Sequence, residues 1–416
     1  MHCRQLVLLG VLLLFQLRPI QPSGLNRFNF SDAFYQDPSG LFNPAAVWNP
    51  AVGWVAVFRW DRCFYQRCGI HHTGTAPLLS VCGKDARAPD LQAASDNYSV
   101  WSFEPKALNK LKRANEASTA TSADLRLFNF GGEVLAGHWM KFGWAAKEAP
   151  AQHKCWSDGW GDPHSCEYTA ISRLNFQKRQ LELLYQFRVP IIGTTYRSEK
   201  NWAFLERGDR LSILYSMLPC TAIFTYDPAS TKGAVFEKGL CYADPDQTIA
   251  SATGLQLSSA RLSGNPVPWT HHAANSSGAD MHAPGSLDFY MQASEPTREL
   301  LGMVHARQGR HDYAHWALRL DADSLAITHI STRPVLQSKS YSDLGGYFAG
   351  VLIVGSFHEI WTPDGQQVLR LLIGEGDQYS AWEDVPLADI DWTTMPHPFE
   401  AQSEDEVLAF DWKNRQ

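Results

Sequence analysis

The sequence lacks a block of basic residues, and it lacks an apolar repeat with helical period that is sustained for long. Its formal net charge is -7 over 416 residues, which argues against binding to nucleic acid or to an anionic membrane surface. No stretch after the N-terminal segment is apolar enough to cross a bilayer. These absences favour a β-rich protein that acts on an uncharged partner.

Several catalytic and metal-binding signatures are also absent. There is no Gly-rich phosphate loop, no Gly-x-Ser-x-Gly elbow and no His-Glu-x-x-His motif. Cys63 and Cys68 have no second ligand pair at zinc-site spacing, and the adjacent His71 and His72 do not supply one. The Gly- and Asp-rich stretch 158–163 lacks the ligand order of an EF-hand, so we interpret it as a disulfide-flanked loop, with calcium binding as the alternative. We therefore expect no metal and no cofactor.

The N-terminus has the pattern of a secretory signal. A basic start, Met1 to Arg4, leads into an apolar run from Leu6 to Leu17 that is short for a membrane span, and prolines and small residues follow up to Gly24. We predict a cleaved signal over residues 1–24, with an uncleaved Golgi-type anchor as the alternative. The whole chain is 44% hydrophobic and 12% aromatic, and we predict that residues 25–416 form one domain that is secreted or lies in the secretory lumen.

The cysteines agree with an oxidising compartment. Removal of Cys3 with the signal leaves seven of the eight cysteines. Their close spacing predicts bridges from Cys155 to Cys166 and from Cys220 to Cys241, while two of the remaining three could pair, which leaves one thiol over. Glycosylation acceptor motifs begin at Asn29, Asn97 and Asn275.

Short apolar runs separated by Gly, Pro and Asp turns predict hairpins along the chain. Val47-Trp48 and the run from Trp54 to Arg59 form one such pair, and a similar pair flanks Gly131-Gly132. About five such units follow one another, so we predict an all-β fold, a five-bladed β-propeller whose loops line a central pocket. A polar insert near 106–122 precedes the second unit. The acidic, irregular C-terminal tail ends in Val407 to Phe410, which we expect to dock as a closing strand or a cap.

The residues at the turns of these units resemble a known family. The ordered series includes Asn43-Pro44-Ala45, Asp124-Leu125-Arg126, Glu199-Lys200-Asn201-Trp202, Ser263-Gly264-Asn265-Pro266 and Gly374-Glu375-Gly376-Asp377. It is similar to the five-bladed propellers of glycoside hydrolase family 130, which comprise β-mannoside phosphorylases, β-mannosidases and related mannosyltransferases. The resemblance covers roughly Leu41 to Asp391. It implies a carbohydrate-active enzyme that acts at a β-mannoside-like linkage, with inorganic phosphate or a sugar donor as conceivable co-substrates.

One motif departs from the family pattern. The acidic signature of the family reads Glu-Asp-Pro-Arg, whereas Ala123 and Leu125 here replace the Glu and the Pro, and Asp124 and Arg126 remain. The departure leaves hydrolysis, phosphorolysis and glycosyl transfer open. Hydrolysis and luminal transfer lead, because a secreted protein does not control the phosphate around it. A glycan-binding propeller that lost catalysis is the alternative from another class.

Glycosyl transfer needs a proton donor at the glycosidic oxygen, because its transition state resembles an oxocarbenium ion. The resemblance implies Asp124 as this acid. Glu375 and Asp377 are candidates for the second carboxylate, which an inverting hydrolase uses to activate water. Arg126 would lower the cost of the charge on Asp124 or bind an anionic donor; a structural Asp-Arg bridge between blades is the alternative.

The other predicted substrate ligands are residues suited to sugar hydroxyls or to stacking on a pyranose. The alternative for Trp202 is packing between blades, and the alternative for each histidine is a satisfied core position. The predicted set is Asn43, Arg59, Arg126, Lys200, Asn201, Trp202, His305, Tyr313 and His315.

Overall fold

A computed structural model of the chain describes a short N-terminal strand and most segments from residue 41 onward. The described residues are 26–27, 41–61, 75–81, 99–100, 102–103, 119–143, 165–187, 202–215, 218–227, 233–244, 247–257, 260–269, 299–307, 312–337, 351–362, 364–375 and 379–415. The predicted signal, the glycosylation acceptors Asn29, Asn97 and Asn275, and residues 106–118 of the predicted insert lie outside them. The last residues of that predicted insert, 119–122, belong to a strand instead.

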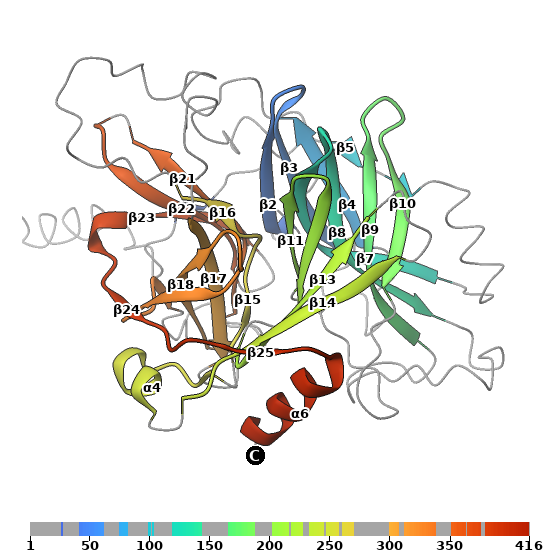
Figure 1. Ribbon diagram of the computed structural model, residues 1–416. Coiled ribbons are helices and arrows are strands. Elements are labelled where there is room, and N and C mark those ends of the chain that lie inside the picture. The colour runs from blue at the N-terminus through green and yellow to red at the C-terminus, as the bar shows by residue number, and fades with distance from the viewer. Residues whose placement is uncertain are drawn as a thin grey trace, which may run out of the picture.

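Almost all regular structure in the described residues is β, in five mainly antiparallel sheets (Figure 1). The first sheet contains β2 (Leu41–Asn49), β3 (Gly53–Asp61), β4 (Thr75–Val81) and β5 (Ser99–Val100). The second contains β7 (Thr119–Phe130), β8 (Glu133–Gly143), β9 (Ser165–Asn175) and β10 (Gln180–Phe187), with β6 (Ser102–Phe103) parallel to β10. The third contains β11 (Trp202–Arg207), β12 (Arg210–Tyr215), β13 (Cys220–Tyr226), β14 (Ala234–Cys241) and β25 (Phe399–Ala401).

The last two sheets draw on distant parts of the chain. The fourth contains β15 (Arg261–Leu262), β16 (Val267–Pro268), β17 (Glu299–Arg307), β18 (Tyr313–Asp321), β19 (Ile327–Ser331), β20 (Leu336–Gln337) and β24 (Trp392–Thr394). The fifth contains β21 (Leu352–Trp361), β22 (Gln367–Glu375) and β23 (Tyr379–Pro386), and β1 (Asn26–Arg27) pairs with β23. The start of the described chain therefore completes the sheet that is made last.

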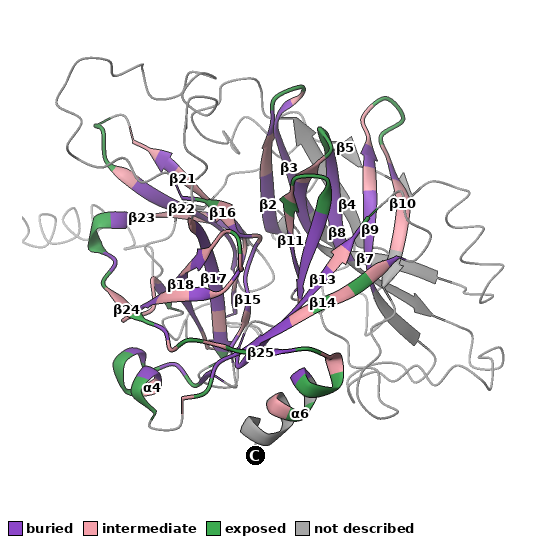
Figure 2. Cartoon of the chain, in the orientation of Figure 1, coloured by how far each residue is buried: buried purple, intermediate pink, exposed green. Residues whose placement is uncertain are grey.

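The first strand of each hairpin returns at a turn that the sequence marks. Gly131 and Gly132 have positive φ angles of 57° and 78°, and they join β7 to β8; Gly208 has a φ of 65° at the turn between β11 and β12. Glycine adopts this backbone conformation without the steric cost that a Cβ would bring. Figure 2 shows exposed turns at the ends of the β2–β3 and β9–β10 hairpins, with mostly buried residues along β3 and mainly intermediate ones along β10. The hairpins predicted around these turns are confirmed.

Polar contacts between hairpin turns tie the first three sheets together in chain order. The Asn49 amide donates to Asn129 Oδ1 over 3.0 Å, and the Asn129 amide donates to the Trp48 carbonyl over 2.7 Å. The next tie runs from the backbone N–H of Gly131 to Glu206 Oε1, 2.9 Å away. Each tie joins the rim of one sheet to the rim of the next.

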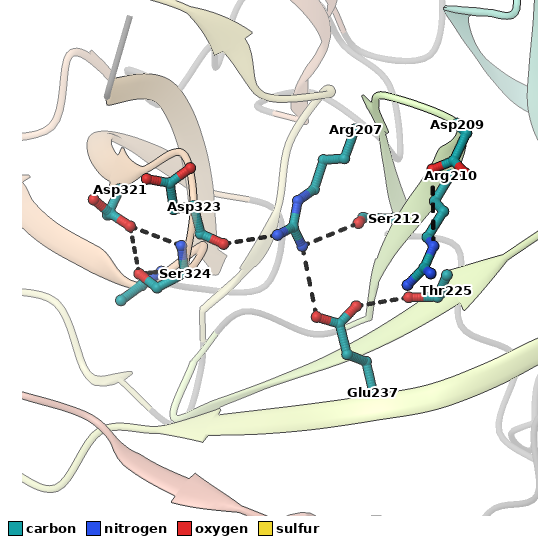
Figure 3. A network of polar contacts seen from close by, with 10 residues as sticks. Arg207, Asp209, Arg210, Ser212, Thr225, Glu237, Asp321, Asp323 and Ser324 are labelled. Carbon is teal, nitrogen blue, oxygen red and sulfur yellow. Dashed lines mark hydrogen bonds and ion pairs between the residues drawn. The ribbon is translucent and has the colours of Figure 1, made fainter. Parts of the chain in front are cut away.

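The third and fourth sheets are joined by the network around Arg207 (Figure 3). Arg207 at the end of β11 donates to the carbonyl of Asp323, which lies in the turn after β18, over 2.8 Å. Its guanidinium also lies 3.6 Å from Glu237, which accepts from the Thr225 hydroxyl over 2.6 Å. Because these groups are partly exposed, each pair contributes only about 0–1 kcal/mol. Their main effect is to fix the relative position of the two turns.

Apolar contacts and one hydrogen bond complete the connections between neighbouring sheets. Phe128 of the second sheet stacks on Phe204 of the third with ring centroids 4.8 Å apart, and a Cβ on Gly137 would lie 1.9 Å from Phe204, so only glycine admits this ring. A shared core joins Trp269 of the fourth sheet to Phe357 of the fifth. The fifth sheet returns to the first where the Ala46 N–H donates to Ser356 Oγ over 3.0 Å.

The described sheets each contact the next, and the fifth also contacts the first, as the blades of a β-propeller do. The prediction of an all-β propeller fold is confirmed. The number of five blades, the central pocket and the extent of the single domain stay predictions. No helix in the described part of the chain combines the length and apolar character needed to span a membrane.

The C-terminal segment, residues 392–415, forms a strap across two sheets (Figure 1). Its strand β24 pairs with β19 of the fourth sheet, and β25 pairs with β14 of the third. Helix α6 (Glu404–Arg415) then contacts β13 and β14. Val407 occupies the space beside Gly239, where a Cβ would lie 2.1 Å from its side chain. The tail therefore caps the outer edges of two sheets, and the predicted segment from Val407 to Phe410 docks as part of a helix.

One predicted disulfide lies in the described residues and is confirmed. Cys220 and Cys241 are bonded and are paired across β13 and β14. Cys155 lies outside the described residues, so its bridge to Cys166 stays a prediction, as does the spare thiol.

We expect the double substitution Cys220→Ala with Cys241→Ala to lower the free energy of unfolding by about 3 kcal/mol. The bridge closes a sequence separation of 21 residues, and a loop of this size restricts the unfolded chain by about that amount. Chemical denaturation of the variant and of the oxidised wild type would measure the difference. Equal denaturation midpoints would show that the ladder of β13 and β14 holds this edge without the bond.

Candidate functional site

The first strands of four sheets, β2, β7, β11 and β21, contact one another across the sheets, and the ladders of β2, β7 and β21 are interrupted. The register breaks between Phe42 and Ala45 in β2, between Ala123 and Arg126 in β7, and between Val354 and Ser356 in β21. In the fourth sheet, residues 263–266 separate β15 from β16. Strand β7 contacts β2, β11 and even β21 of the fifth sheet. β-Bulges redirect side chains and are common beside active sites, so these breaks mark the centre of the ring as the candidate site.

Asn43 sits in the first of these bulges. Its φ of 51° is left-handed, which Asn tolerates better than most residues, and its side chain is buried. It packs against the fifth sheet so closely that a Cβ on Gly374 would lie 2.1 Å from Asn43 Oδ1. Glu375 follows in β22 and is 1% exposed. The structure thus places a predicted substrate ligand and a predicted carboxylate at the same joint between the first and fifth sheets.

Asp124 lies in the β7 bulge, between the last residue paired before the break and Arg126. Its side chain is outside the described part of the chain. The residue across the ladder from this bulge is His138 of β8, because Gly137 pairs with Arg126 and Trp139 pairs with Ala123. His138 is buried, and its Nε2 lies 2.8 Å from Ser172 Oγ of β9. A buried polar pair, His138 and Ser172, therefore lies across the ladder from the backbone of Asp124.

Arg126 reaches from β7 to two neighbouring sheets. Its Nη1 donates to the carbonyl of Trp202 over 2.7 Å and to that of Gly264 over 3.0 Å, and its Nη2 donates to that of Leu262 over 3.3 Å. The side chain is buried. Through these contacts Arg126 joins the second, third and fourth sheets. This structural role is separate from the predicted role in anion binding.

Asn265 makes a second joint of the same kind. Its amide donates to the carbonyl of Leu127 over 3.0 Å, and its Oδ1 accepts from the N–H of Phe204 over 3.0 Å. The segment 262–265 of the fourth sheet is thus held from both sides by the second and third sheets. Asn265, a residue of the motif Ser263-Gly264-Asn265-Pro266, therefore links the fourth sheet to the second and third sheets.

The structure brings three predicted ligands together in the fourth sheet. His305 of β17 and His315 of β18 are paired across the ladder, with ring centroids 5.5 Å apart, and the Tyr313 ring lies 5.6 Å from that of His305. The hydroxyl of Ser263 lies 2.7 Å from His305 Nδ1. His315 is fully buried. The cluster adjoins the segment that Arg126 and Asn265 hold.

Burial decides the protonation of these histidines. Burial, and then the nearby His315, Arg126 and Arg261, hold the pKa of His305 well below its ordinary value. Burial alone lowers the pKa of His315 to about 3. Both rings are therefore neutral at neutral pH, and a neutral imidazole can accept a hydrogen bond as well as donate one.

Other predicted ligands are placed differently or lie outside the described residues. The Trp202 indole is buried and packs on Tyr215 of the same sheet with centroids 4.7 Å apart, so Trp202 is a core residue of this sheet. Arg59 lies in β3 and its backbone pairs with Phe42, but its side chain is not described. Lys200, Asn201 and Asp377 fall outside the described residues, and their roles stay predictions.

Two polar residues of the site were not predicted from sequence. His138 lies in a largely apolar strand, and Ser172 lies in a strand of mixed polarity, and neither residue belongs to a recognisable motif. The sequence signal that could have pointed to His138 is its expected pairing with the segment around Asp124, where the apolar and polar residues of the strand stop alternating. No group of three or more metal-ligating side chains occurs among the described residues, and the Gly- and Asp-rich loop 158–163 is not among them.

Comparison with known proteins gives similarity at the level of structure only. No family model matches the sequence, and no curated protein matches it. Among solved structures, one reported for the glycoside hydrolase family 130 of mannoside phosphorylases is similar over 92% of this chain and 96% of its own, with 11% identity and a TM-score of 0.44. Its description names β-1,2-mannosidic linkages in Candida mannan as the target of the family's hydrolases.

Two further similar structures have named organisms. An α-L-arabinofuranosidase from Lactobacillus brevis is 13% identical over 89% of this chain and 94% of its own, with a TM-score of 0.42. A mannose phosphorylase from Leishmania mexicana, solved with a phosphate ion, is 13% identical over 90% of this chain and 92% of its own, with a TM-score of 0.38. Similarity at this level assigns no residue a role.

Proposed function

We propose that this chain is a carbohydrate-active enzyme that cleaves or transfers a glycosyl residue, with Asp124 as its general acid. The observation that carries the proposal is the bulge in β7, which places the backbone of Asp124 beside a joint of three sheets. A carboxyl group held at such a point has a fixed approach to a bound substrate, and fixed geometry is what proton transfer in the transition state requires.

The chemistry assigns distinct tasks to the neighbouring groups. Asp124 gives its proton to the glycosidic oxygen as the bond to the anomeric carbon breaks. A second carboxylate on the other face of the sugar takes a proton from the attacking water or acceptor hydroxyl. Glu375 is buried and follows Gly374, the residue that packs against Asn43, and it and Asp377 are the proposed candidates for that task.

The substrate class follows from the sequence resemblance to glycoside hydrolase family 130. We propose a β-mannoside-like linkage on a glycan, with binding contributed by Asn43, His305 and Tyr313. The neutral His305 can accept a hydrogen bond from a sugar hydroxyl, and the fully buried His315 packs behind it. We place the protein in the secretory pathway or outside the cell, in agreement with the bridge between Cys220 and Cys241.

A second candidate is a glycan-binding propeller without catalysis. The observation that favours it is the engagement of Arg126 with three carbonyl groups, since a structural Arg beside Asp124 needs no reaction to explain it. Binding without turnover would distinguish this candidate from the enzyme.

The test is incubation of the secreted chain with a panel of β-mannosides and other glycans. Parallel reactions would contain no additive, inorganic phosphate, or nucleotide- or lipid-linked mannose. Free sugar, sugar phosphate and an elongated glycan identify hydrolysis, phosphorolysis and transfer respectively. Glycan binding on an array with no product in any reaction would replace the enzyme by the binding protein, and neither binding nor product would end the carbohydrate proposal.

A further inference from the structure

The buried hydroxyl of Ser263 has a single polar partner among the described residues. Ser263 is 1% exposed, and its Oγ lies 2.7 Å from Nδ1 of His305. Its backbone N–H donates to the carbonyl of Met303 over 2.9 Å, which fixes the residue against β17. A buried hydroxyl needs a partner for its proton, because an unsatisfied buried donor costs free energy. The only group in place to receive that proton is the His305 ring.

This contact decides which nitrogen of His305 carries the ring proton. Neutrality alone lets Nε2 either accept or donate, since a neutral imidazole has one protonated and one bare nitrogen. With the proton on Nδ1, the ring would donate to Ser263 Oγ and leave the hydroxyl proton buried without an acceptor. With Nδ1 bare, the hydroxyl donates to it and both groups are satisfied. The ring proton therefore lies on Nε2.

Nε2 is also the ring nitrogen that can meet a ligand. It has no hydrogen-bond partner among the described residues, and it is not enclosed, whereas both ring nitrogens of His315 are. His305 is a partly exposed residue of β17, paired with the strand that precedes segment 262–265. That segment is held at the candidate site by Arg126 and Asn265. An exposed N–H donor therefore lies beside the joint of three sheets.

The His305 ring is held on further sides by its cross-strand neighbours. The ring of His315, which is 0% exposed, lies 5.5 Å from it, and the ring of Tyr313 lies 5.6 Å from it. A ring that packs on two neighbours and is bonded at Nδ1 has little freedom to rotate. The Nε2–H bond therefore keeps one direction, as specific recognition of a polar group on a ligand requires.

We propose that Ser263 is a positioning residue that holds His305 in the tautomer protonated at Nε2, so that His305 donates a hydrogen bond to the oxygen of a sugar hydroxyl. The identity of this acceptor rests on the proposed function, whereas the tautomer does not. The proposal extends that function by naming the binding atom, the direction of the hydrogen bond and the residue that enforces it.

Nitrogen-15 NMR of the full chain, labelled at histidine, tests the tautomer. The chain has 15 histidines, and the His305 signals are assigned by their loss in His305→Gln. At neutral pH we expect a protonated Nε2 and a bare, hydrogen-bonded Nδ1 in the wild type. Ser263→Ala should move both shifts towards the average of the two tautomers. A proton on Nδ1 in the wild type, or unchanged shifts in Ser263→Ala, would overturn the proposal.

The matched control is Ser212→Ala. Ser212 is also 1% exposed, but its hydroxyl bonds to Arg207 in the third sheet instead of to a histidine. This variant removes an equally buried hydroxyl and should leave the His305 shifts and the kinetics as in the wild type. A change in the His305 shifts of Ser212→Ala equal to that in Ser263→Ala would show a general effect of serine loss and would refute the specific role of Ser263.

Kinetics test the bond from His305 to the sugar. We expect Ser263→Ala to raise KM for the glycan by about 3- to 10-fold, the effect of one misdirected hydrogen bond, and to change kcat by less than about twofold. Removal of the accepting hydroxyl from the substrate should weaken wild-type binding by a similar factor and binding to Ser263→Ala much less. A lower melting temperature with unchanged KM would make Ser263 merely structural and would refute the positioning role.

The two measurements separate failure of this proposal from failure of the proposed function. The tautomer is measured without any substrate. A wild type that neither binds nor converts glycans would end the proposed function and, with it, the sugar hydroxyl as the acceptor. The ring shifts of the wild type and of Ser263→Ala would still decide whether Ser263 sets the tautomer of His305.

Discussion

Asp124→Asn is expected to reduce turnover of a glycoside substrate by roughly 10²- to 10⁴-fold, with binding of the glycan retained. The substitution keeps the size and most hydrogen bonding of the side chain but removes the proton that the leaving oxygen needs, and general acid catalysis contributes a factor of this size. Measurement of kcat and KM, with glycan affinity determined separately, tests this result. Substrates whose leaving group needs no protonation should be much less affected.

The control for this variant is Asp209→Asn, at an exposed hairpin turn where the side chain is 93% exposed. It should leave kcat, KM and stability unchanged. A structural bridge at Asp124 predicts a different outcome, a loss of about 3–5 kcal/mol of unfolding free energy along with activity, because a buried partner would be left without its counter-charge. Normal turnover in Asp124→Asn would end the assignment of this residue as the acid.

Arg126→Met is expected to lower the free energy of unfolding by about 3–5 kcal/mol. Methionine fills much of the same volume, but the carbonyls of Trp202, Leu262 and Gly264 lose a charged donor, and such bonds contribute about 1.5–3 kcal/mol each before relaxation. Urea denaturation measures the loss. Arg126→Lys should recover part of it, since an ammonium keeps the charge but does not reproduce the planar fork.

Arg210→Met provides the control for Arg126→Met, because the Arg210 side chain is 68% exposed beside Asp209. It should change stability by less than about 1 kcal/mol. Wild-type stability in Arg126→Met, combined with weakened binding of phosphate or of a charged donor, would instead make Arg126 a ligand. The two measurements together decide between the structural and the binding role.

Hairpins were predictable because their signals are local. Gly131-Gly132 and Gly208 fix turns through backbone geometry, and the apolar runs on both sides must then pair with each other. The C-terminal helix also had a local signal. Ser403 and Glu406 have the spacing of a capping box, and the Glu406 N–H does donate to Ser403 Oγ. That spacing predicts a helix start ahead of Val407, where a strand or a cap was expected.

The contact partners of the residues at the centre could not be predicted from local signals. Arg126 bonds to Gly264, 138 positions further along the chain, and no local pattern tells whether a guanidinium will meet a substrate or a carbonyl of another sheet. Trp202 shows the same limit, since its position at the start of a strand fits either a sugar platform or a core residue. The strands β1 and β6 contain two residues each, too few to show any alternation.

The closure of the ring has a consequence for biosynthesis. Among the described strands β1 is synthesised first, yet its partner β23 is made more than 350 residues later. The strap of residues 392–415 follows β23, and it covers the edges of β14 and β19. Strands β1, β14 and β19 therefore wait for their partners until this late stage of synthesis, while unpaired strand edges in the growing chain are exposed to aggregation. A premature stop before residue 392 would remove no residue of the proposed centre, yet it would leave two open edges for chaperones and quality control to recognise.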